Sequence, residues 1–303
     1  DSFKTIKSEH ADSVHEQTIV PESFKRRKVA PFLEGPMHAM RVEKDPIVRQ
    51  HIYDQVRASE LFDRKLGMYT VTGDLSKESP EIGRCHVFSP GWLENQSVFL
   101  HMEYKWLLEL LKSGLYNEYL HDFETALVPF QDPSVYGRSV YENVSFIASS
   151  AFPNKKNHGT GFVARLSGST AEFLDMWLKM NVGDKPYKVN ASGELEFHLQ
   201  PVLPLWIFTK NEIKKEFTLK SGEKINATIP QNGYAFVFMS QTLMVYHNTK
   251  QAATVGDGRS QIKQIRFLDK NKKKVIIQGH VLPAPHAQDL RSGAIRRIDV
   301  ELG

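Results

Sequence analysis

Three stretches of the chain are richer in glycine, serine, asparagine and aromatic residues than ordinary loops: residues 89–96, 136–150 and 157–162. Soon after the third stretch, the residues Ser167, Gly168 and Ser169 stand at the start of a predicted helix. Backbone N–H groups and hydroxyls at a helix N-terminus favour a bound anion, and the helix dipole adds to that preference. The segment therefore predicts an anion site, with a plain capping box of the form Ser169-x-x-Glu172 as the alternative.

Other residues near these stretches could bind a polar ligand. His101 lies on the polar side of a predicted helix and could donate to a phosphate, or it could face solvent without a function. Glu94 and Glu142 could bind sugar or act as acids, and Trp92 could stack on a sugar ring. A surface loop carboxylate and a core tryptophan are the alternatives for these residues.

The elements that would position these residues change type along the chain. Residues 1–45 are polar and interrupted by prolines, so we expect an irregular arm or linker. Apolar spacing predicts helices over 46–68, 97–113, 116–128 and 169–182 in a helical part, residues 46–185. Beyond Pro186 apolar and polar residues alternate with a period of two. Short strand candidates bounded by turns, one of them at residues 206–208, predict an antiparallel β-sandwich over residues 186–303.

Composition sets limits on the class of protein. The chain has 303 residues and a net charge of +4, and its basic runs, 25–28 and 270–274, carry no nucleic-acid-binding pattern. No apolar run approaches the roughly 18 residues of a membrane span. The single cysteine, Cys85, cannot form an intramolecular disulfide, so we expect a cytoplasmic protein.

Two motifs together resemble the inverting glycoside phosphorylases, meaning the cellobiose phosphorylases and, more closely, the long β-1,3-oligoglucan phosphorylases. The stretch from Gly91 to His101 resembles the loop that leads into an inner barrel helix with a phosphate-binding histidine. Residues 164–173 resemble the family turn whose hydroxyl and backbone amide hold phosphate. The resemblance covers residues 60–303 and implies the last helices of an (α/α)6 barrel followed by a jelly roll.

This resemblance implies a reversible phosphorolysis of β-glucan oligosaccharides to α-glucose 1-phosphate, with inversion at the anomeric carbon. It assigns phosphate binding to His101, Ser167, Gly168 and Ser169, and substrate binding to Trp92, Glu94, Asn95 and Glu142. Inorganic phosphate is the co-substrate, and no cofactor or metal is expected. Family members also form homodimers, so we expect one here.

The resemblance also has departures. Ser167 stands where relatives often carry threonine, which keeps a hydroxyl. The aspartate that serves as general acid is expected upstream of this sequence, in an N-terminal part of the same enzyme or in a companion chain. A non-catalytic carbohydrate-binding or scaffold subunit is the first alternative, and a hydrolase that uses Glu94 or Glu142 is the second.

Overall fold

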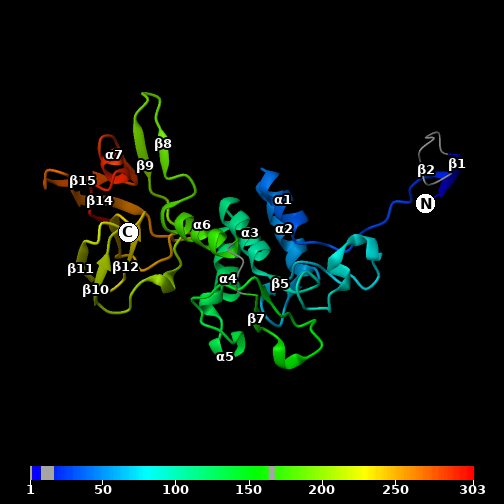
Figure 1. Cartoon of the computed structure of the whole chain (residues 1–303). Coiled ribbons are helices and arrows are strands. Elements are labelled where there is room, and N and C mark those ends of the chain that lie inside the picture. Colours follow the sequence, from blue (N-terminus) through cyan, green and yellow to red (C-terminus); the bar gives the residue numbers. More distant parts are fainter. Residues whose placement is uncertain (1, 8–16, 164–167) are drawn as a thin grey trace.

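The computed structural model describes residues 2–7, 17–163 and 168–303. Helices dominate the middle of the chain and strands the last third, as Figure 1 shows. Most strand pairs are antiparallel and most sheets are small. The prediction of a chain that mixes helices with antiparallel sheets is therefore confirmed.

Among the first 45 residues, those that the structure describes form more regular structure than their polar composition predicts. Strands β1 (Ser2–Lys7) and β2 (Gln17–Ser23) form an exposed hairpin that stands away from the body of the molecule (Figure 1). Helix α1 (Glu34–Val42) instead belongs to the core, since Met37 and Met40 are buried. Pro36 does not prevent this helix because it lies in the first turn, where no intrahelical N–H bond is needed.

Helix α2 (Pro46–Ala58) begins as predicted, with the Asp45 side chain accepting from the N–H of Ile47. It ends ten residues earlier than predicted. Ser59 adopts an extended conformation and its hydroxyl donates to the carbonyl of Val56, which closes the helix. The chain then turns through the short antiparallel strands β3 (Phe62–Asp63) and β4 (Met68–Tyr69).

Helix α3 (Leu100–Lys112) lies at the centre of the helical part. Most of its surface is buried, as its nearly continuous apolar composition predicts. It packs against α1, α4 (Tyr116–Ala126) and α6 (Gly168–Val182). It starts three residues later than predicted because Val98–Phe99 forms β5, which pairs with β6 (Phe146–Ile147).

The last third contains a five-stranded sheet in the order β12-β13-β17-β14-β15. These strands are β12 (Gly233–Phe238), β13 (Thr242–Asn248), β14 (Ile262–Leu268), β15 (Lys274–Gln278) and β17 (Arg297–Leu302). The neighbours β13 and β17 are parallel, and the other pairs are antiparallel. A second sheet joins β8 (Tyr187–Val189), β9 (Leu195–His198) and β16 (Val281–Leu282).

Smaller elements complete this part of the chain. The hairpin of β10 (Ile213–Thr218) and β11 (Lys224–Ile229) covers Leu243 and Val245 on the outer side of the large sheet. The remaining helices are α5 (Pro133–Tyr136), α7 (His286–Arg291) and the 3-10 turns Pro80–Ile82, Arg84–Val87, Val128–Phe130, Lys155–Asn157 and Leu205–Ile207. The strand predicted at residues 206–208 is therefore wrong, because the chain makes a tight turn directly after Pro204.

The helical and strand-rich parts share one core. The hydroxyl of Tyr246 on β13 donates to the carbonyl of Asn181 near the end of α6, at 2.6 Å, and both residues are fully buried. Met244, Ile298 and Val300 on the inner side of the sheet join the same cluster as Leu107 of α3. The large sheet is thus fixed to the helices that carry the candidate site.

Candidate phosphate and sugar site

A small sheet brings together the three stretches that the sequence singles out. In it β6 lies between β5 and β7 (Gly161–Phe162). Phe146 is paired with Phe99 on one side and with Phe162 on the other. Each strand has only two residues, so this sheet serves to hold three loops side by side.

His101 lies in the first turn of α3, directly after β5, and about a third of its side chain is exposed. Its imidazole ring rests against Gly168, the first residue of α6. A β-carbon at position 168 would lie 2.5 Å from Nδ1 of the ring, so only glycine permits this approach. The structure therefore places the predicted histidine at the helix N-terminus that the sequence identifies as an anion site.

Glu172 holds the other edge of the His101 ring, with Oε1 3.5 Å from Nε2. This contact differs from the predicted capping box. Ser169 lies inside α6, which begins at Gly168, so Ser169 is not the N-cap residue. Glu172, one turn further into the helix, thus contacts the histidine, which the sequence pattern did not reveal.

The turn before α6 is described only in part. Ser167, to which the resemblance assigns a phosphate-binding hydroxyl, lies outside the described residues. Ser169 is buried and its hydroxyl points to the carbonyl of Val144, at 3.4 Å, so only its backbone N–H faces the N-terminal end of the helix. Thr170 accepts a hydrogen bond from the Asn143 side-chain amide at 3.4 Å, which ties the second stretch to the start of α6.

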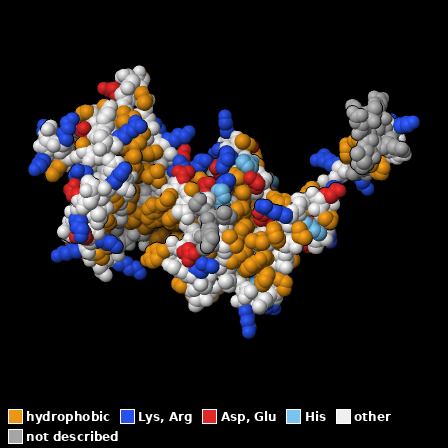
Figure 2. Space-filling view, viewed as in Figure 1, with side chains coloured by type: hydrophobic (Ala, Val, Ile, Leu, Met, Phe, Trp, Pro, Cys, Tyr) orange, Lys and Arg blue, Asp and Glu red, His pale blue; other side chains and the backbone are white. Residues whose placement is uncertain are grey.

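A row of aromatic rings leads away from His101. Phe99 stacks on Phe146 with centroids 4.7 Å apart, and Phe146 on Phe162 at 5.7 Å. Phe162 in turn lies parallel to Trp92 at 3.7 Å. Figure 2 shows hydrophobic side chains gathered on the face over β5 and β7. Trp92 is thus part of a partly exposed aromatic surface beside the predicted anion site.

The carboxylates and the amide predicted to bind sugar are engaged by protein groups. Arg84 holds Glu94 through two hydrogen bonds, of 2.5 and 2.9 Å. Asn95 is buried and donates to the carbonyl of Phe88. Glu142 pairs with Arg138 at 3.0 Å. Each of the two carboxylates therefore has an arginine partner.

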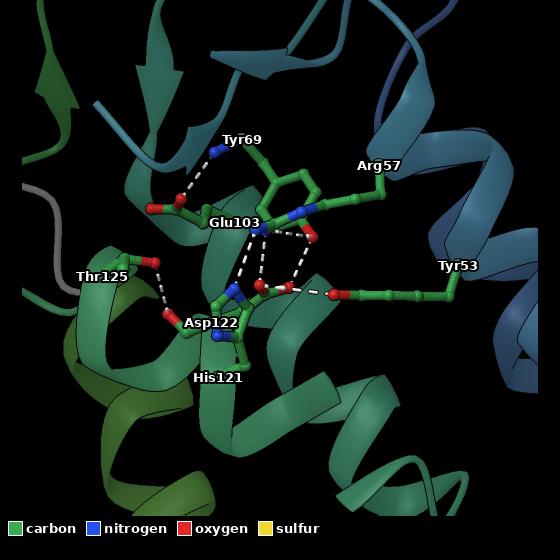
Figure 3. Close-up of polar contacts among 7 residues, drawn as sticks. All are labelled: Tyr53, Arg57, Tyr69, Glu103, His121, Asp122 and Thr125. Carbon is green, nitrogen blue, oxygen red and sulfur yellow. Dashed lines mark hydrogen bonds and ion pairs between the residues drawn. The ribbon is translucent and has the colours of Figure 1, made fainter. Parts of the chain in front are cut away.

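A second polar cluster lies deep between α2, β4 and α4, and sequence reasoning missed it. Tyr69, Arg57 and Tyr53 converge on the carboxylate of Asp122, which has no exposed surface (Figure 3). The Tyr69 hydroxyl and an Arg57 nitrogen both lie 2.5 Å from its oxygens. Asp122 therefore joins three elements, which indicates a structural role.

Burial perturbs the titration of this cluster. It raises the pKa of Tyr53 to about 12, with the Asp122 charge acting in the same direction. It also raises the pKa of Asp122, against the opposing effects of the Tyr69 hydrogen bond and the Arg57 charge. Glu103 on α3 is fully buried, and burial holds its pKa well above the ordinary value. Its Oε1 accepts from the N–H of Tyr69, and Oε2 has no partner within the described part of the chain.

Three further observations concern metal binding, membrane spanning and the single cysteine. Across the residues that the structure describes, no group of three or more His, Cys, Asp or Glu side chains is placed to hold a metal ion. The same residues include no helix with the length and apolar character needed to cross a bilayer. Cys85 is buried.

Comparisons with protein-family models and with curated proteins give no match to this chain.

Proposed function

We propose that this chain forms the phosphate-binding part of an inverting glycoside phosphorylase that acts on β-glucan oligosaccharides. The contact between His101 and Gly168 carries the proposal, because it joins two separate motifs at one helix N-terminus. An imidazole beside the backbone N–H groups of a helix start suits an anion that must attack a sugar carbon.

In this proposal each group of the site has one task. The N–H groups at the start of α6 and the His101 ring hold phosphate, and Glu172 keeps the ring in position. The aromatic surface of Trp92 and Phe162 lies against the glucan. Phosphate attacks the anomeric carbon from the face opposite the leaving oxygen, while an acid protonates that oxygen.

The remaining parts of the proposal concern architecture and partners. The helices α3, α4 and α6 are the last helices of an (α/α)6 barrel, and the strand-rich part is a jelly roll. The general acid comes from an N-terminal part of the same enzyme or from a companion chain, and the assembly is a cytoplasmic homodimer. Inorganic phosphate is the co-substrate.

An assay on native material tests this function. Material that contains this chain is purified and its intact mass and companion chains are determined. It is then incubated with α-glucose 1-phosphate and short β-1,3-glucans. The proposal predicts phosphate release equal to the glucose added to the glucan. It also predicts that His101→Ala lowers this release at least about a hundredfold. Absence of release from every chain assembly recovered would contradict the proposal.

The second candidate is a non-catalytic carbohydrate-binding subunit. The partly exposed aromatic surface of Trp92 and Phe162 would serve such a subunit equally well. It predicts binding of β-glucan without any response to phosphate.

A further inference from the structure

A cavity on the strand-rich part of the chain lies away from His101 and Gly168. It has a volume of about 760 Å³, within the range typical of small-molecule sites. Its walls are the β14–β15 turn and the segment that enters β17. Lys and Arg outnumber carboxylates among its lining residues by six to two, the six being Arg266, Lys270, Lys272, Lys274, Arg296 and Arg297.

Two of these cations form ion pairs with carboxylates that do not line the cavity themselves. Arg296 pairs with Glu223 at 3.2 Å, and Lys270 pairs with Asp289 at 3.5 Å. Neither of these acids lines the cavity. Each of these two cations therefore has its carboxylate partner outside the lining, and each has more N–H groups than this one pair uses.

Arg297 is fixed in a different way, from within the wall. Its guanidinium makes two hydrogen bonds to Asp299, of 2.8 and 2.9 Å. Burial alone would raise the pKa of Asp299, but hydrogen bonds from His247 and Arg297 outweigh it and lower the pKa to about 2. Asp299 is thus ionised near neutral pH, where its two hydrogen bonds orient Arg297.

Lys272 and Lys274 have no ion pair or side-chain hydrogen bond within the described residues, and both are exposed. The turn that carries Lys272 is ordered, because Asp269 accepts from the N–H groups of Asn271 and Lys273 at 2.8 and 2.9 Å. Each of the four other cations that line the cavity lies within ion-pair distance of a carboxylate. Lys272 and Lys274 are thus the two lining cations whose charge is left for a bound anion.

The side chains that line the cavity indicate the class of anion. Arginine forks together with lysines favour phosphate groups. A nucleic-acid strand would need an exposed aromatic surface for its bases, and the aromatic ring in this wall, Phe267, is buried. Most of the accessible lining is apolar, and it includes Leu268, which is 56% exposed, and Ala294.

We propose that this cavity binds a small molecule with two or more adjacent phosphate groups, at a site separate from that of His101. The ligand phosphates contact Lys272, Lys274 and Arg297, and any organic portion lies against Leu268. This site does not depend on the proposed phosphorylase function.

Isothermal titration calorimetry with tripolyphosphate and with ATP, without divalent cations, tests the proposal. The double variant Lys272→Glu/Lys274→Glu is compared with Lys214→Glu/Lys215→Glu, which makes the same change of charge on β10, outside the cavity. All titrations use the His101→Ala chain, so that the phosphate site proposed at His101 does not contribute. We expect one molecule of either probe per chain and about tenfold weaker binding in the first double variant. The second double variant should bind within about twofold of the chain that carries His101→Ala alone.

Failure of both probes to bind would overturn the proposal. So would equal weakening by the two double variants, because it would show attraction to the overall charge instead of a site. Tripolyphosphate binding alone assigns the site to the phosphate chain, and tighter ATP binding assigns a contact to the organic portion. Both of these results support the proposal. Circular dichroism of each variant confirms that it is folded.

Discussion

Gly168 at the start of α6 lies against the imidazole of His101 at the start of α3, closely enough that a β-carbon would come within 2.5 Å of Nδ1. Two other side chains contact the ring. Oε1 of Glu172 lies 3.5 Å from its Nε2, and the Phe99 ring lies edge-on to it with centroids 6.0 Å apart. Two helix starts from distant parts of the sequence thus form one polar corner. The candidate site depends on this contact.

Replacing Gly168 with alanine should displace the His101 ring and weaken phosphate binding about tenfold or more, which calorimetry would measure. The matched control is Gly35→Ala on α1, where an added β-carbon has no neighbour within 4 Å. That control should bind phosphate as the unmodified chain does. Unchanged phosphate affinity in Gly168→Ala would show that the contact has no role in binding.

Replacing Asp122 with alanine should lower the free energy of unfolding by about 3–5 kcal/mol, because Arg57 would keep a partly buried charge without its partner. Urea unfolding measures this change. Asp54→Asn on α2 is the control, since Asp54 is exposed, and it should change stability by less than about 0.5 kcal/mol. A loss for Asp122→Ala as small as that of the control would contradict the structural role of the cluster.

Glu103 should make stability fall as pH rises. Its pKa in the folded chain lies well above the ordinary 4.5, so the folded state retains a proton that the unfolded state releases. The loss begins near pH 4.5 and amounts to about 1.4 kcal/mol per pH unit until the folded-state pKa is reached. Glu103→Gln should remove this part, so that the difference in free energy of unfolding shifts in the variant's favour as pH rises above about 4.5. Parallel stability curves for the two proteins would contradict it.

Deletions separate the exposed hairpin from the core. Removing residues 1–24 takes away β1 and β2, which stand apart in Figure 1, and should leave the melting temperature within about 2 °C. Removing residues 1–43 also takes away Leu33, Met37 and Met40, each at most 1% exposed. The loss of each such buried side chain lowers the free energy of unfolding by about 2–5 kcal/mol, so that shorter chain should not fold. Equal melting temperatures for both deletions would show that α1 is not part of the core.

The sequence predicted α3, α4 and α6 well, but it missed α1, extended α2 too far and did not reveal the two-residue strands. Helix α3 was evident because apolar residues cover most of its surface. Strands β5, β6 and β7 have two residues each, and two residues carry no period. Their pairing is a tertiary feature that pattern analysis cannot supply.

The candidate site shows the same division. His101 and Gly168 were both named from local pattern, but their contact depends on how α3 and α6 pack. Glu172 was assigned to a capping box, and the structure turns it to His101. Glu103 did leave a signal in the sequence, because this carboxylate lies among the apolar residues of α3 and not on its polar side. Its position in the helix predicts a buried acid.

The most direct test of the central claim is the melting temperature in phosphate and in chloride at equal ionic strength. The unmodified chain should melt a few degrees higher in phosphate at concentrations well above the dissociation constant. His101→Ala should lose that rise. His38→Ala, which removes a histidine paired with Glu34 on α1, should keep it. An equal rise in all three proteins, or in none, would contradict a phosphate site at His101 and the start of α6.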